Sequence, residues 1–298
     1  MAALQATVGG QVRAAAWAGI CLALGALGCA SQPEYVTDEQ AGSDHALFSI
    51  ERSTQANNQQ SAKAGALAGF VRVPVTVDTD TAMGLMGLDL RLPDMGQCAV
   101  RDTQRSPDTP LSPIDRVQLL EVGDVSVQAG EISTTLAPRA FPTVTDLISG
   151  VVYTTRDLSA EPLPAGEAYT VRTAGSDTIE PMALDADAPG ELGSVTIGGL
   201  PLAEVKTLSP DHPIDLTWRV GDPADVVYVE LSAPNSACVV CSFNDSDGAA
   251  TVPAEAFSGS GQGRISLHRV RTEEFQGAGL ERSELRFDFE LATDVTYE

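Results

Sequence analysis

The chain has 298 residues, of which 18 are Lys or Arg and 41 are Asp or Glu. Its formal net charge is therefore −23 at pH 7. A surface this acidic repels nucleic acid and anionic lipid headgroups, so we exclude a nucleic-acid-binding function. The same charge is compatible with divalent cations, neutral glycans or basic protein partners. Aromatic residues make up only 5% of the chain, which argues against an extended carbohydrate-binding surface.

The first 28 residues have the composition of an export signal. Arg13 is their only basic side chain, and they contain no Asp or Glu. An uncharged run from 14 to 28 follows and ends in small residues, an order that is typical of a signal peptide. The run has 15 residues, whereas a membrane span needs roughly 20. We therefore predict a signal peptide at 1–28, and a retained membrane anchor is the weaker alternative.

The end of this segment, Ala26-Leu27-Gly28-Cys29, resembles the lipobox of bacterial lipoproteins, in which small residues precede a cysteine that receives diacylglycerol before cleavage. The resemblance implies that Cys29 becomes the first residue of the mature chain and carries acyl chains such as palmitate. In Gram-negative lipoproteins of this kind, Asp after the cysteine favours the inner membrane. The residue here is Ala30, which implies the outer membrane. The alternative is an ordinary signal peptide that contains a cysteine.

Residues 29–66 are rich in Gln, Asn, Ser, Asp and Ala and contain few apolar side chains. A segment of this composition cannot bury enough surface to offset the entropy that it loses on ordering. It predicts a flexible tether that holds the folded part away from the membrane. A short helix within 44–52 is the alternative for part of it.

Residues 67–188 are expected to form an N-terminal β domain. Short runs that alternate between apolar and polar residues, or are rich in β-branched residues, predict strands, and Pro, Gly, Asp and Ser between them predict turns. Many short strands with regular turns are typical of a sandwich or barrel. One helical turn is expected near Asp146. The predicted strands are 70–77, 87–92, 116–120, 124–128, 131–136, 151–155, 168–173 and 179–184.

A linker at 186–190 precedes a second series of strands, which we assign to a domain at 189–298. Seven strands in about 110 residues match the size of an immunoglobulin-like sandwich. The fold class expected for the whole chain is therefore all-β, with two β-sandwich-like domains after a signal peptide and a disordered tether. The predicted strands are 194–197, 214–219, 225–231, 238–243, 250–252, 263–271 and 285–292.

The run from Ile214 to Trp218, a short loop, and the run from Val226 to Leu231 are similar to the B and C strands of fibronectin type III-like domains. In that family the tryptophan packs between the two sheets, so the resemblance implies a core position for Trp218. The alternative is that Trp218 and Tyr228 stack on a neutral sugar. Because Trp218 shares a strand face with Ile214, the core interpretation is favoured.

Three cysteines follow Cys29, namely Cys98, Cys238 and Cys241, so an oxidising compartment would leave one disulfide and one thiol. Cys238 and Cys241 have CxxC spacing, but a redox function needs a strand-to-helix turn that lowers one thiol pKa. In a flat strand, residues three apart point to opposite faces. Zinc would need a second pair of ligands, and none is visible. We therefore favour a structural disulfide or free cysteines, and leave the pairing open.

No catalytic motif of the common hydrolase, metalloprotease or nucleotide-binding classes occurs in the chain. His45 falls in the predicted tether and His212 in a turn. His268 is expected on the exposed face of a strand, opposite Ile265 and Leu267. No spacing brings a histidine beside a serine and a carboxylate, so we predict that the protein is not an enzyme. The alternative is a hydrolase or isomerase whose site assembles from distant loops.

Calcium is the one ion that the composition favours, since Asp245 and Asp247 offer hard oxygen ligands on a tight turn. The segment is not an EF-hand, because Phe243 and Ala254 occupy ligand positions of that motif. Asp-Gly turns are also common without a metal. No other cofactor is expected. The hypothesis for function is a non-enzymatic binding or structural module of the cell envelope, with a calcium-dependent adhesion or glycan-binding protein as an alternative.

Overall fold

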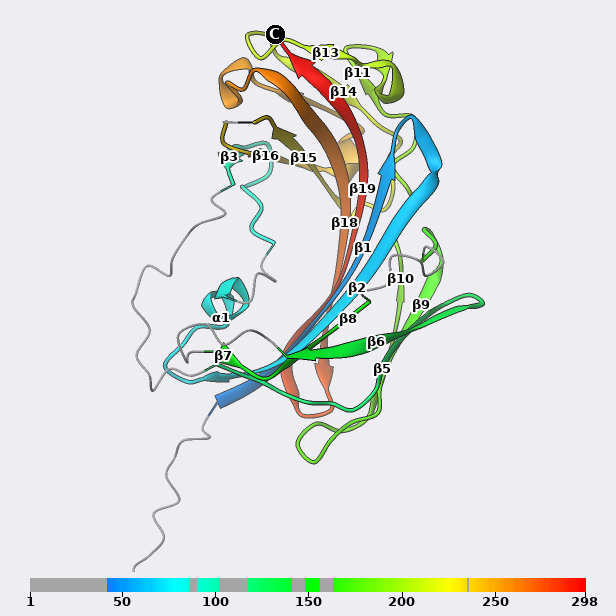
Figure 1. Ribbon diagram of the computed structural model, residues 1–298, viewed down its shortest axis with the longest axis vertical. Helices are drawn as coiled ribbons and strands as arrows, with labels where there is room; N and C mark the ends of the chain where they lie inside the picture. The colour runs from blue at the N-terminus through cyan, green and yellow to red at the C-terminus, as the bar shows by residue number, and fades with distance from the viewer. Residues whose placement is uncertain (1–41, 86–89, 102–116, 141–147, 156–162, 235) are drawn as a thin grey trace, which may run out of the picture. The chain divides into compact units, whose positions relative to one another are not determined.

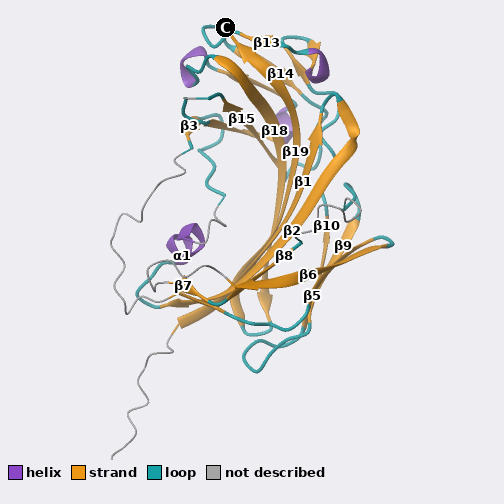
Figure 2. Cartoon of the chain, viewed as in Figure 1, coloured by secondary structure: helices purple, strands orange, loops and turns teal. Residues whose placement is uncertain are grey.

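The computed structural model describes residues 42–85, 90–101, 117–140, 148–155, 163–234 and 236–298. The predicted signal peptide at 1–28, Cys29 and the tether up to residue 41 lie outside these ranges, as does the helical turn expected near Asp146. The described part is built of strands, and its one α-helix has seven residues (Figure 2). The all-β class is therefore confirmed. No helix in the ranges above is both long and apolar enough to cross a membrane.

In the described ranges the elements are a long series of strands with one α-helix and three single 3₁₀ turns. Their bounds are β1 (Gly42–Gln55), β2 (Asn58–Pro74), α1 (Thr79–Leu85), β3 (Cys98–Val100), β4 (Val117–Leu119), β5 (Val125–Ala129), β6 (Ile132–Ala140), β7 (Ile148–Ser149), β8 (Val151–Thr154), β9 (Ala168–Thr173), β10 (Met182–Asp187), β11 (Thr196–Ile197), β12 (Leu200–Pro201), η1 (Leu202–Glu204), β13 (Thr207–Leu208), β14 (Ile214–Thr217), β15 (Val226–Ser232), β16 (Val239–Asn244), η2 (Asp245–Asp247), β17 (Ala249–Val252), η3 (Ala254–Ala256), β18 (Gly261–Gly277) and β19 (Leu280–Tyr297).

Most of the strands join one large sheet in the order β10-β9-β5-β6-β8-β2-β1-β19-β18-β15-β16-β3. Its middle consists of two long hairpins, β1–β2 and β18–β19, which meet where β1 pairs with β19 in parallel (Figure 1). The β18–β19 hairpin closes through Ala278 and Gly279, which both have positive φ, as in a type I′ turn. A separate small sheet has the order β12-β11-β14-β17.

Strands β1 and β2 correct the prediction of a tether at 29–66, which is wrong from residue 42 onward. Phe48 and Ile50 are buried, and β2 faces the same core through Ala66 and Ala68. These alanines bury little apolar area each, so the local composition resembles that of a tether, and the pairing with β19 is what orders the segment. The helix considered for 44–52 is also wrong. His45 is not in a tether but is buried in β1.

Two hydrophobic cores lie on the same side of the long hairpins. The first core contains Phe48, Phe70, Val125, Tyr169 and Phe287, and the second contains Leu216, Val229, Cys241, Leu267 and Leu291, among others. β19 serves both, with Leu285, Phe287 and Phe289 in the first core and Leu291, Val295 and Tyr297 in the second.

The predicted boundary between a domain at 67–188 and another at 189–298 is therefore wrong. The chain from Gln40 to Glu298 forms one compact unit. β1 and β2 precede the boundary in sequence and β18 and β19 follow it, yet they form one continuous sheet. Segments far apart in sequence pair here, and local composition carries no information about such pairing.

We call the side of the long hairpins opposite the two cores the outward face. Helix α1 covers one part of it, because Ala82 is buried against Leu47, Val71 and Val73 of β1 and β2. Asp78 caps this helix by accepting a hydrogen bond of 2.8 Å from the backbone N–H of Thr81.

Residues 90–95, which we call the strap, cross another part of the outward face. Leu90 and Leu92 pack against Tyr228, Val240 and Val270. The strand predicted at 87–92 is therefore wrong for 90–92, which have no strand pairing, and 87–89 lie outside the described ranges. Leu90 and Leu92 alternate with polar residues because one side of the strap contacts the sheet. The prediction at 168–173 coincides with β9, and the others agree with observed strands to within a few residues, except that β2, β18 and β19 are much longer than predicted.

Candidate functional site

The outward face of β1, β15, β18 and β19 carries a row of polar side chains. Because side chains alternate along a strand, Leu285, Phe287 and Phe289 face the core while Arg286 and Asp288 face outward. By the same alternation, His268 of β18 and Glu51 of β1 lie on this outward face. Local sequence thus places a charged layer directly behind a hydrophobic core.

A hydrogen-bonded chain of three side chains lies at the centre of this row. Ser266 Oγ is 3.0 Å from His268 Nε2, and His268 Nδ1 is 2.7 Å from Asp288 Oδ1. Tyr228 donates a hydrogen bond of 2.7 Å to Asp288 Oδ2 and stacks on the His268 ring, with centroids 4.1 Å apart. We call these four residues, together with Glu51, the His268 cluster. The structure therefore corrects the expectation that no histidine meets a serine and a carboxylate.

His268 is also less exposed than the strand pattern indicates, because only 13% of its side chain is accessible. The pattern placed it correctly opposite Ile265 and Leu267, but Tyr228 covers its ring. The signal that could have found the cluster is the spacing of Ser266 and His268, two residues apart on one strand face. Asp288 comes from a different strand, so no local motif includes it.

The charges in the cluster are not balanced. Burial opposes the ionisation of Asp288, but the charge and hydrogen bond of His268 outweigh burial and hold the pKa of Asp288 below its usual value. Glu51 stands opposite Asp288 in the strand register, and its pKa is raised, first by desolvation and then by the charge of Asp288. Two carboxylates thus lie side by side, and Glu51 is the one that loses its charge more easily.

We expect Glu51→Gln to stabilise the protein at neutral pH. A raised pKa in the folded state means that Glu51 contributes stability below its unfolded pKa and loses that contribution as the pH rises through the folded pKa. At pH 7 the substitution should therefore raise the free energy of unfolding, by about 1 kcal/mol or less, because Glu51 is only partly desolvated and solvent still screens its charge. Urea unfolding at pH 7 and pH 3.5 should show this gain at the higher pH alone. Glu281→Gln, an exposed position on β19, is the control, and an equal gain there would contradict the assignment.

The Ser266–His268–Asp288 chain has the connectivity of a catalytic triad but lacks its surroundings. Ser266 is only 3% exposed and lies in the middle of β18, paired with Glu230 on one side and Ala292 on the other. Backbone N–H groups in such a ladder are already used, so the strand offers no pair of free donors for an oxyanion. The geometry favours a hydrogen-bonded network that holds three strands together.

A groove of about 500 Å³ adjoins the cluster, between the strap and the outward face. Its lining comprises Leu90, Leu92, Pro93, Asp94 and Met95 of the strap, with Ala224, Val226, Val270, Thr272, Glu284 and Arg286 from the sheet side. The lining combines apolar and polar side chains, and Met95 is 46% exposed. Arg286 connects the groove to the cluster, since its charge acts on both Glu51 and Asp288.

The calcium site predicted at Asp245 and Asp247 is wrong, because a guanidinium takes the place of the cation. Asp245 is fully buried, and its Oδ1 accepts hydrogen bonds from Nε and Nη2 of Arg269 at 3.2 and 2.9 Å. Its Oδ2 accepts the backbone N–H of Gly221. Asp247 lies apart and contacts Asn244. Within the described ranges, no group of three or more His, Cys, Asp or Glu side chains is placed to hold a metal ion.

The neutral-sugar platform considered for Trp218 and Tyr228 is also not formed. Both side chains are buried, at 5% and 1% exposure, and they lie on opposite sides of the sheet. Trp218 belongs to the second core, and its indole N–H donates to the carbonyl of Asp245 at 3.0 Å.

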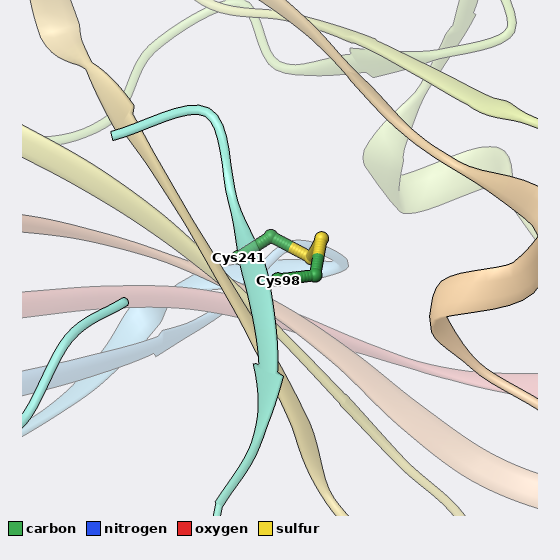
Figure 3. The surroundings of a disulfide bond; sticks show 2 residues. All are labelled: Cys98 and Cys241. Atoms are coloured by element: carbon green, nitrogen blue, oxygen red, sulfur yellow. A yellow bond between two sulfur atoms is a disulfide. The ribbon is translucent and has the colours of Figure 1, made fainter. Parts of the chain in front are cut away.

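The cysteines divide into a disulfide and a thiol. Cys98 of β3 is bonded to Cys241 of β16, its partner in the strand register (Figure 3). Cys241 faces the second core, whereas Cys238 lies on the outward face beside Tyr228 and Val240. The sheet therefore separates the Cys238 thiol from the disulfide. Burial raises the pKa of the Cys238 thiol to about 12, which favours its protonated form at neutral pH.

No family model matches the chain, and no curated protein matches it. Similar solved structures include the mu homology domain of Fcho1 from Danio rerio with bound Eps15 peptide, with a TM-score of 0.24, 8% identity, and coverage of 87% of this chain and 99% of that chain. Another is the FN1–FN3 part of chicken CNTN1, with a TM-score of 0.21, 12% identity, and coverage of 75% and 77%. TM-scores this low decide neither a fold family nor a function.

Proposed function

We propose that this chain is an outer-membrane lipoprotein of a Gram-negative cell envelope, anchored through acyl chains on Cys29, and that it acts as a non-enzymatic binding module. The lipobox resemblance at 26–29 supports the anchor. The Cys98–Cys241 disulfide supports an oxidising compartment, since disulfides persist there and are rare in the cytosol. The net charge of −23 supports a protein ligand or a surface polymer rather than nucleic acid.

The observation that carries the binding function is the groove between the strap and the outward face. Its volume of about 500 Å³ falls in the usual range for ligand sites. Its floor belongs to β15, β18 and β19, which are long, paired strands, so the site rests on a rigid element. A pure envelope spacer would not need such a recess.

The anchor has a direct test. Cys29→Ala should abolish metabolic labelling by palmitate and release the protein from the membrane fraction, because several acyl chains at roughly 0.8 kcal/mol per buried CH₂ supply the attachment. Cys238→Ala is the control and should leave both the label and the fractionation unchanged. Continued labelling of the Cys29→Ala variant would refute the lipid assignment.

The Ser266–His268–Asp288 chain favours a hydrolase as the second candidate. A fluorophosphonate probe distinguishes the two functions, because it labels an activated serine and ignores a buried structural one. We expect no labelling of the wild-type protein. Labelling that is lost in Ser266→Ala and in Asp288→Asn would replace the binding function by hydrolysis.

A further inference from the structure

We propose that the groove takes an extended segment of a partner protein in which a Lys or Arg side chain is flanked by apolar residues. This inference rests on the proposed binding function and adds the chemistry of the partner. It follows from three properties of the groove, namely its length, the apolar side chains in its walls and its uncompensated negative charge.

The length of the groove fits a short stretch of extended chain. Its floor crosses three strands, since Val226 of β15 stands opposite Val270 of β18, and Thr272 of β18 stands opposite Arg286 of β19. Two steps between neighbouring strands span about 10 Å, and an extended chain rises about 3.3 Å per residue. The groove therefore covers about three residues of a bound segment.

The walls of the groove favour apolar side chains on either side of the charged one. Leu92, Pro93 and Met95 line the strap side, and Val226 and Val270 line the sheet side. Met95 is 46% exposed, so covering it removes apolar surface from water. A small free cation would leave these walls exposed, which is why a peptide segment is the better occupant.

The charge of the groove favours a cation. Arg286 is already compensated, because its Nε and Nη2 contact Glu284 Oε1 at 2.7 and 2.6 Å. Asp94 is exposed and forms no ion pair with any other described residue. Next to the groove, Glu51 faces Asp288, a second place where negative charge exceeds positive charge.

The net charge of the whole molecule also favours a cationic segment. With a net charge of −23, it attracts cationic segments at long range and repels acidic ones, and salt weakens both effects. An acidic segment would have to displace Glu284 from Arg286 and then lie beside Asp94. The carboxylates therefore select Lys or Arg over Asp or Glu.

The test compares short fluorescein-labelled peptides with a central Leu-Lys-Leu, Leu-Gln-Leu or Leu-Glu-Leu, titrated with the full chain and followed by fluorescence anisotropy. We expect the Lys peptide to bind most tightly, with an affinity that falls as salt is raised. Asp94→Asn should weaken it two- to fivefold, roughly the range of a surface ion pair. Met95→Ser should weaken the Lys and Gln peptides alike, because it removes apolar contact.

Two substitutions of the same chemistry serve as controls at distant exposed positions. Asp211→Asn removes the same charge, and Leu200→Ser removes an apolar side chain that is 55% exposed on β12. Neither should change the affinity. Because Asp94 and Met95 are exposed, circular dichroism of their variants should match the wild type, which separates lost binding from lost folding.

Several results would overturn the inference. The Lys and Glu peptides could bind with equal affinity, or Asp94→Asn could have no effect beyond that of Asp211→Asn. N-acetyl-lysine amide could bind as tightly as the Lys peptide, or no peptide could bind at all. Tighter binding of the Glu peptide that Met95→Ser weakens would overturn only the partner's chemistry and keep the groove as a binding site. Absence of all binding, together with fluorophosphonate labelling at Ser266, would end the proposed function as well.

Discussion

Arg269→Met should lower the free energy of unfolding by about 3 to 5 kcal/mol, because it leaves a buried carboxylate without its cation. The Arg269 side chain is 3% exposed and that of Asp245 is 0% exposed. Arg269 also donates to the carbonyls of Gly190, at 3.0 Å, and Glu191, at 3.2 Å. Gly190 and Glu191 lie where the chain passes from the first core, at Ala188, to the second core, at Leu192. The Arg269 guanidinium therefore fixes this connecting segment to β18, and the substitution removes all of these contacts together.

Two further variants show whether the cost comes from the unpaired charge. Arg269→Met combined with Asp245→Asn should be less destabilising than Arg269→Met alone, since the amide carries no charge and can still accept from Gly221. Arg282→Met is the matched control, because Arg282 pairs with Glu274 on the same hairpin with both side chains more than half exposed. Its cost should be small, because solvent screens an ion pair that is this exposed.

Urea unfolding followed by circular dichroism measures all three variants. A cost for Arg269→Met no larger than that for Arg282→Met would mean that the buried Arg269–Asp245 pair does not stabilise the connection at Gly190 and Glu191. A double variant less stable than Arg269→Met would mean that Asp245 contributes mainly through its other hydrogen bonds.

Removal of the Cys98–Cys241 disulfide should be the other large effect. The bond closes a loop of 143 residues, and the chain-entropy relation assigns about 5 kcal/mol to a loop of that length. Native disulfides contribute about 2 to 5 kcal/mol when removed, so we expect Cys98→Ala to fall in this range. Strand β3 has only three residues at the edge of the sheet, so its pairing with β16 should open first.

Hydrogen exchange at Ala99 and Val240 reports on that pairing, and urea unfolding with and without a reductant reports on stability. The reductant should destabilise the wild type and leave Cys98→Ala unchanged. Cys238→Ala is the control, because its thiol takes no part in the bond, and it should keep the response to the reductant. A wild type that ignores the reductant under denaturing conditions would contradict the assignment.

The sequence alone determined the β class and most strand positions, since alternation of side chains is a local property. It also placed Cys238 and Cys241 on opposite faces and Trp218 in a core, because the same period of two decides both. The central β1–β2 hairpin could not be predicted from the sequence. The residues of β2 are small and many in β1 are polar, so the composition of the segment is the same as that of a flexible tether.

Only the tertiary structure decided which strands pair with one another. The parallel pairing of β1 with β19 joins residues more than two hundred positions apart, and it merges the two predicted domains into one unit. The same long-range pairing brings Glu51 opposite Asp288. The pairing of β15 with both β16 and β18 sets Asp245 against Arg269 rather than against a calcium ion. Strand pairing is non-local, so the partner of each polar side chain follows from register across the sheet and not from its neighbours in sequence.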